Sequence, residues 1–169
     1  MSALTTDRIR ASAVKLGLTH LAETITQLVA RAEAVDMGYL DFVDLLLQEE
    51  TGLRDSRRFT IALKSSGLPH HKTLDEFDFA FQPDLDTRKI RDLATLEFVR
   101  AKSNLVLLGP PGVGKTMLAV ALAVTACQAG FSIYFTTLDD LVRKLRAAET
   151  NGRFNRQLAA YLRPAVLVV

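Results

Sequence analysis

A glycine-rich octapeptide in the second half of the chain limits the possible folds more than any other feature. Residues 109–116 read Gly-Pro-Pro-Gly-Val-Gly-Lys-Thr and match the pattern GxxxxGK followed by Ser or Thr at every fixed position. The apolar run Asn104–Leu108 precedes it, and the alanine-rich segment Gly114–Ala129 follows. A short continuous apolar run is typical of a strand buried on both faces of a parallel sheet. We therefore predict a strand, a glycine loop and a helix in this order.

The octapeptide has the chemistry of a phosphate-binding loop. Glycines let backbone N–H groups wrap around a phosphate, and the following helix directs its positive dipole end at the same anion. We expect Lys115 to reach the β and γ phosphates and the Thr116 hydroxyl to bind Mg²⁺. The predicted cofactors are ATP and Mg²⁺. The predicted nucleotide site consists of Gly109, Pro110, Pro111, Gly112, Val113, Gly114, Lys115 and Thr116.

The rest of the second half alternates between strand and helix patterns. We predict strands over Ser132–Thr136 and Ala165–Val169, with helices over Leu138–Ala148 and Phe154–Leu162 between them. Strand, helix, strand, helix and strand in succession indicate an α/β fold with a parallel sheet. The single cysteine, Cys127, lies on the alanine side of the helix after the loop, and we expect a buried core residue there.

Phosphoryl transfer needs a second acidic element at the end of another buried strand. Asp139 and Asp140 follow the second predicted strand, but Thr137 with Asp140 fits a capping box that opens the next helix. The better position is directly after the run Ala165–Val169, where the sequence stops. We therefore assign no catalytic residue and expect no ATP turnover by the isolated chain.

The first half of the chain has helical periodicity. Candidate N-caps are Thr5, Thr6 and Asp7, and Gly17 is a predicted break. A helix is expected from Tyr39, with Gly52 separating it from a second, basic helix that ends at Gly67. Residues Thr73–Leu85 alternate phenylalanines with polar or small residues and predict an extended linker. Asp86 and Thr87 are expected to cap one further helix through Val99.

These patterns divide the chain into three predicted parts. They are an all-helical N-terminal domain over residues 1–69, a linker over 70–86, and the N-terminal part of a P-loop ATPase domain over 87–169.

A basic cluster lies near the end of the predicted N-terminal domain and in the linker. Its charge is opposed only by Asp55, although the whole chain carries a net charge of just +2. Such a run is either a solvated helix face or a contact for the phosphates of double-stranded DNA. The candidate DNA-binding residues are Arg54, Arg57, Arg58, Lys64 and Lys72.

Composition excludes several classes of protein. The chain is 49% hydrophobic and 24% charged, which is typical of a globular protein with a core rather than a disordered one. Its apolar runs are far shorter than the roughly 20 residues that span a bilayer, and its N-terminus lacks a signal-peptide pattern. We expect a cytoplasmic protein without a membrane partner. One cysteine and three histidines do not suffice for a disulfide framework or a four-ligand zinc site.

Together these features resemble the IstB-like ATP-binding proteins, the transposition helpers of certain bacterial insertion sequences. The resemblance covers the whole chain and is strongest at Leu74–Phe79, Ile90–Ala94, Gly109–Thr116, Ala126–Gly130 and Leu141–Leu145. It implies the AAA+ class of P-loop ATPases, similar to bacterial helicase loaders. It also implies ATP-dependent assembly on DNA, homo-oligomers of the full-length protein, and delivery or activation of a transposase.

The resemblance also implies parts that this sequence lacks. Family members continue from the strand matching Ala165–Val169, the Walker B strand, into an Asp-Glu pair, further strands, an arginine finger and a lid. We therefore expect an incomplete, truncated AAA+ sheet in which Leu105–Leu108 has no neighbouring strand. Three alternatives remain open: a replicative helicase loader, a small-molecule kinase, and a non-enzymatic partner-docking module with a vestigial nucleotide site.

Overall fold

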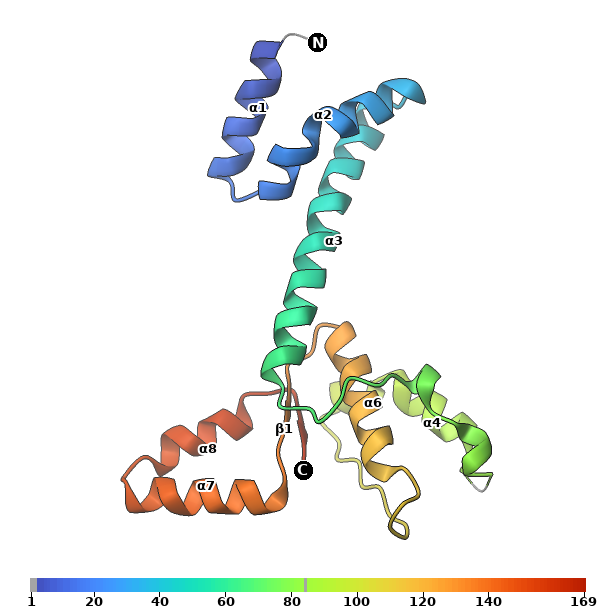
Figure 1. Cartoon of the computed structure of the whole chain (residues 1–169), viewed down its shortest axis with the longest axis vertical. Helices are drawn as coiled ribbons and strands as arrows, with labels where there is room; N and C mark the ends of the chain where they lie inside the picture. The colour runs from blue at the N-terminus through green and yellow to red at the C-terminus, as the bar shows by residue number, and fades with distance from the viewer. Residues whose placement is uncertain (1–2, 84) are drawn as a thin grey trace. The chain divides into compact units, whose positions relative to one another are not determined.

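The computed structural model describes residues 3–83 and 85–169, and it is mostly helical with one small parallel sheet (Figure 1). Asp84, which falls in the linker predicted over 70–86, lies outside the described residues. Contacts along the chain define two compact units, with the boundary between Arg58 and Phe59 inside one long helix. We call these the first unit and the second unit and describe each by itself.

The first unit contains helix α1 (Ala3–Lys15), helix α2 (Thr19–Ala34) and most of helix α3 (Tyr39–Ser65). Helices α1 and α2 pack against each other, and their buried residues are Ala13, Ile25, Leu28 and Ala32. The predicted break at Gly17 is confirmed, since its φ of 71° lies in the left-handed region. The predicted caps Thr5, Thr6 and Asp7 are wrong, because α1 already includes them.

Helix α3 runs without interruption through Gly52, so the predicted break there is also wrong. A glycine inside a helix costs about 1 kcal/mol relative to alanine. That cost is too small to end a helix of 27 residues in which strong helix formers such as leucine and arginine are frequent. The helix ends where predicted, before Gly67, which has a φ of 73°.

The second unit is built around helix α6 (Lys115–Gln128). Eight of its residues are buried: Leu118, Val120, Ala121, Leu122, Ala123, Val124, Ala126 and Cys127. Gly130 is the C′ residue of the helix, as predicted. Its N–H donates to the carbonyl of Cys127, and the Phe131 N–H donates to that of Ala126. These two bonds form a Schellman motif, which satisfies carbonyls at the end of the helix.

The sheet consists of strand β1 (Ile133–Phe135) and strand β2 (Val166–Val168), paired in parallel with Ile133 opposite Val166. The chain passes between them through helix α7 (Leu138–Thr150) and helix α8 (Phe154–Leu162), which pack as a hairpin (Figure 1). These four elements were predicted from the sequence. On its other edge, β1 is covered by the turn after α3, because the Phe135 N–H donates to the Ser66 carbonyl at 2.7 Å.

The strand predicted over Asn104–Leu108 is wrong. In the described part of the chain only β1 and β2 form a sheet, and the segment before the glycine loop belongs to neither. Val106 is 71% exposed and Leu108 is 88% exposed. With no neighbouring strand to satisfy its N–H and C=O groups, the segment has no ladder, and Val106 and Leu108 stay outside the core. Strand β2 is likewise only half-buried, not buried on both faces as predicted.

The predicted extended linker contains two 3-10 turns, η1 (Leu74–Glu76) and η2 (Phe79–Phe81). A capping box between Thr73 and Glu76 opens the first, and the Asp78 carboxylate caps the second by accepting the Ala80 N–H. The prediction failed because these side chains offer local hydrogen bonds that compete with extended backbone.

The single helix expected after the linker is two: α4 (Thr87–Ala94), capped by Asp86 as predicted, and α5 (Glu97–Arg100). Leu96 separates them in the left-handed conformation with a φ of 63°.

Candidate functional site

The predicted phosphate-binding loop lies directly before α6 and leads into its first turn. Gly112 and Gly114 both have a φ of 85°, in the left-handed region that glycine adopts without strain. Gly114 is the N-cap of α6, so no side-chain oxygen caps the helix, and no acidic residue lies in its first turn. The positive end of the helix dipole is therefore left without a negative side chain at the loop.

Lys115, the first residue of α6, folds back over the loop. Its Nζ donates to the carbonyl of Gly109 at 2.8 Å and to that of Pro110 at 2.6 Å. Both acceptors are neutral backbone groups, so within the described residues the ammonium charge has no carboxylate partner. The lysine and the helix N-terminus thus place uncompensated positive charge on one loop, and this arrangement fits an anion such as a phosphate group.

A hydrophobic cluster in the core of the second unit packs against the two ends of the loop. Its buried members are Phe77, Ile90 on α4 and Leu118 on α6. Leu107, from the segment before the loop, packs against the same cluster. Both ends of the loop are therefore anchored by apolar contacts. Its middle, from Pro110 to Gly112, is exposed to solvent.

The structure locates Thr116, the residue that we expect to bind Mg²⁺, but it shows no cluster of metal ligands around it among the described residues. Thr116, the predicted hydroxyl ligand, is exposed in the first turn of α6. In the described ranges, no group of three or more histidine, cysteine or acidic side chains has the spacing of a metal site.

Asp139 and Asp140 lie in the first turn of α7, where Thr137 and Asp140 were predicted to form a capping box. The Thr137 hydroxyl accepts the Asp140 N–H at 3.2 Å, which confirms Thr137 as the cap. The Asp140 carboxylate bonds to the guanidinium of Arg143, and this hydrogen bond lowers the pKa of Asp140. Asp140 thus has a structural partner within its own helix.

The candidate DNA-binding residues fall in both units. In the first unit, the Arg54 guanidinium donates to the Glu50 carboxylate at 3.2 Å and to the Gly17 carbonyl at 2.9 Å, so it has a structural role. Arg57 and Arg58 are exposed on α3, with Arg58 3.8 Å from Asp55. In the second unit, Lys64 and Lys72 are also exposed.

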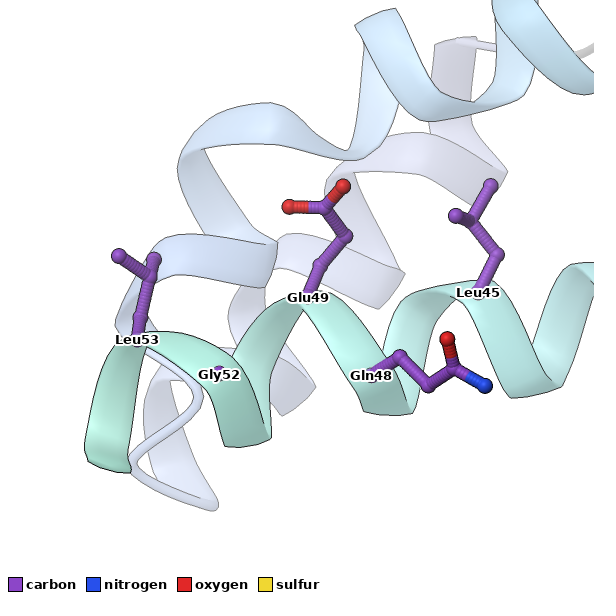
Figure 2. Close-up of a pocket in the computed structure, with 5 residues that line it drawn as sticks. All are labelled: Leu45, Gln48, Glu49, Gly52 and Leu53. Carbon is purple, nitrogen blue, oxygen red and sulfur yellow. The ribbon is translucent and has the colours of Figure 1, made fainter. Parts of the chain in front are cut away.

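A pocket of about 390 Å³ lies on α3 in the first unit (Figure 2). Gly52 contributes no side chain to it, and the Glu49 side chain projects between Leu45 and Leu53. The Glu49 carboxylate lies 3.9 Å from Nε2 of His20. Because the lining residues of this pocket include a single carboxylate, the glycine loop is the stronger candidate for a binding site.

Sequence reasoning missed one residue of the candidate site. Phe77 was placed in an extended linker, yet only 7% of it is exposed and it packs beside Gly114. The phenylalanines of this segment led only to the prediction of an extended linker and did not indicate what Phe77 would cover. Cys127, in contrast, is buried in α6 as predicted, and burial raises the pKa of its thiol.

The second unit thus combines a small parallel sheet with helices, and a glycine loop opens its central helix α6. Residues 11–169 match the family described as IstB-like ATP binding protein, and the chain belongs to this family. The expectation drawn from the sequence is therefore confirmed.

Three individual proteins are similar to this chain over most of its length. The chain is 37% identical to an ATP-binding protein of insertion sequence IS5376 from Geobacillus stearothermophilus, over 96% of this chain and 65% of the relative. It is 41% identical to an ATP-binding protein of IS21 from Pseudomonas aeruginosa, over 92% of this chain and 58% of the relative. For one of IS232 from Bacillus thuringiensis the identity is 30%, over 91% and 62%.

The chain thus spans about 60% of the length of these relatives. Among the described residues, no helix combines the length and the apolar character needed to cross a bilayer.

Proposed function

We propose that this chain binds ATP with Mg²⁺ at the loop Gly109–Thr116 and serves as a helper of DNA transposition, acting on double-stranded DNA together with a transposase. The observation that carries the nucleotide assignment is the position of Lys115. In the described structure its charged Nζ bonds to loop carbonyls alone, at the uncapped start of α6. The relatives named for insertion sequences support the transposition context.

The loop would act on a nucleotide through charge and position. Backbone N–H groups at the start of α6 and the Lys115 ammonium would hold the phosphates, and the Thr116 hydroxyl would contribute one oxygen to the metal. When bound, Mg²⁺ neutralises phosphate charge and fixes the phosphate geometry. To reach a phosphate, Lys115 must exchange its present carbonyl acceptors for phosphate oxygens. That exchange replaces neutral acceptors with charged ones and is favourable.

For the DNA contact, the exposed arginines of α3 are the better candidates within the first unit. Arg54 is held by Glu50 and by the Gly17 carbonyl, whereas Arg57 and Arg58 extend from an exposed stretch of the helix. Contacts from such side chains to phosphates release counterions and carry no sequence preference. We therefore expect DNA binding that is independent of sequence and depends steeply on salt.

The DNA role is tested by fluorescence anisotropy with a labelled duplex at several salt concentrations. For wild type, the logarithm of the association constant should fall linearly with the logarithm of salt concentration. Replacing Arg57 and Arg58 with alanine should reduce that slope by about one for each phosphate that these arginines neutralise.

The matched control replaces Arg8 and Lys15, two exposed basic residues of α1, and so removes the same charge from the same unit. Only the first pair should change the slope. Equal effects from both pairs would contradict a specific role for α3, and no measurable binding by wild type would remove DNA from the proposal.

A further inference from the structure

Gly114, the last loop residue before α6, has an aromatic ring packed directly against it. A Cβ atom at this position would lie 3.0 Å from Cε2 and 3.4 Å from Cζ of Phe77. The ring therefore occupies the space that any other residue's side chain would need. The loop backbone and the Phe77 ring are in close contact at the point where the chain turns into the helix.

The Phe77 ring is itself held in place. It is buried with Ile90 and Leu118, and it meets the ring of Phe79 edge-on, with ring centroids 4.9 Å apart. Its backbone N–H donates to the Leu74 carbonyl at 3.1 Å, which closes turn η1. A ring fixed by packing, an aromatic contact and a backbone hydrogen bond can act as a rigid support.

The contact with the Phe77 ring is confined to the end of the loop at Gly114. Gly112 has the same φ of 85° as Gly114, yet a Cβ atom there would meet nothing within 4 Å. The two glycines therefore share a conformation but differ in surroundings. The end that sets the start of α6 and the direction of Lys115 rests on Phe77, and the middle of the loop is open.

We propose that Phe77 is a positioning residue for the phosphate-binding loop. It fixes the backbone at Gly114 and thereby the first-turn N–H groups of α6 and the Lys115 side chain. This inference rests on the proposed nucleotide site. It also makes the segment Thr73–Phe79 part of that site, although the segment contributes no group that would touch a phosphate.

The test compares Phe77→Ala with Ile90→Ala in the full chain. Ile90 belongs to the same buried cluster, so its truncation removes core packing without removing the ring at Gly114. Two readouts are taken on each protein. The first is loop exchange, measured without nucleotide as hydrogen exchange of the Leu118 amide, which donates to the Gly114 carbonyl at 2.9 Å. The second is the affinity for a fluorescent methylanthraniloyl ADP. Phe77→Ala should speed loop exchange and weaken ADP binding by about tenfold, the equivalent of 1.4 kcal/mol. Ile90→Ala should change both much less.

A conservative pair covers the case in which the alanine variants do not fold. Phe77→Leu keeps an apolar side chain beside Gly114. Compared with Phe77→Ala, it should restore most of the loop protection and of the ADP affinity. Both values should then match those of Ile90→Val. Equal loop exchange in the Phe77 and Ile90 variants would overturn the positioning role, as would a loop that already exchanges at the unprotected rate in wild type. If wild type binds no ADP while only the Phe77 variants speed loop exchange, the positioning role stands and the proposed nucleotide function fails.

Discussion

The carboxylate of Glu50 on α3 accepts the backbone N–H of Leu21 at 3.2 Å, and so α3 caps the N-terminus of α2. The N-cap residue of α2 itself, Leu18, has no side-chain oxygen to serve this purpose. Glu50 is only 6% exposed, and Arg54 donates to its other oxygen at 3.2 Å. The buried carboxylate is thus satisfied on both oxygens, and it links α3 to the α1–α2 hairpin.

This link predicts that Glu50→Ala destabilises the protein. The variant leaves the Leu21 N–H without its acceptor, whereas Arg54 loses one of two acceptors and keeps the Gly17 carbonyl. A hydrogen bond to a charged group, such as that from Leu21 to the buried carboxylate, contributes about 1.5–3 kcal/mol. We expect the free energy of unfolding in urea to fall by about 1.5–3 kcal/mol. Glu49→Ala is the matched control, because Glu49 is partly exposed and lies 3.9 Å from His20. It should cost under about 1 kcal/mol, and equal losses would argue against the cap.

Gly114→Ala and Gly112→Ala should differ in stability although both residues have a φ of 85°. The left-handed conformation costs either alanine about 1–2 kcal/mol. At Gly114 the new methyl group also collides with the Phe77 ring, and overpacking adds about 1–3 kcal/mol. Thermal unfolding of the two variants measures this difference directly. A Gly112 variant as unstable as the Gly114 variant would show that the ring contact adds nothing.

Thr137→Ala should destabilise α7. The Thr137 hydroxyl accepts the Asp140 N–H at 3.2 Å, and loss of an N-cap of this kind costs about 0.5–2 kcal/mol. Thr137→Ser keeps the hydroxyl and should retain most of that stability in urea unfolding. If serine and alanine were equally unstable, the threonine methyl group, not the cap, would be the stabilising feature.

Cys127 should resist thiol reagents in the folded protein. It is 4% exposed, and burial raises the pKa of its thiol, so the reactive thiolate is scarce at neutral pH. Reaction with dithiobis-nitrobenzoate should be slow in buffer and fast in urea. The same shift has a consequence for stability: the folded state keeps the proton while the unfolded thiol ionises, so stability falls as pH rises through the unfolded pKa. Fast reaction of the native protein would contradict this burial.

Much of the second unit could be predicted from the sequence because its signals are local. The helix α6 is set by its alanine-rich pattern and by Gly130, and α7 begins where Thr137 provides a cap. Strands β1 and β2 were recognised from short apolar runs. The equally apolar run Asn104–Leu108 has no strand in the described structure, since pairing depends on a neighbour and composition does not encode one.

The candidate site combines features of both kinds. The residues of the glycine loop follow from their spacing, whereas the support from Phe77 depends on how a distant turn packs, which no pattern within the loop indicates. In the basic cluster, residues that look alike in the sequence differ in the structure. Arg54 matches its neighbours in sequence, but its hydrogen bonds to Glu50 and Gly17 give it a structural role that charge counting could not reveal.

Calorimetric titration of Mg²⁺-ATP into wild type and Lys115→Ala tests the proposed nucleotide site most directly. Lys115 supplies the only side-chain cation in the loop, and charge-assisted bonds to phosphate are about twice as strong as neutral ones. Lys144→Ala, which removes an exposed lysine of α7, serves as the charge-matched control. We expect saturable binding by wild type and by the Lys144 variant, and loss of binding by Lys115→Ala. Equal affinity in all three proteins, or no binding by wild type, would contradict the assignment of this loop as the ATP site.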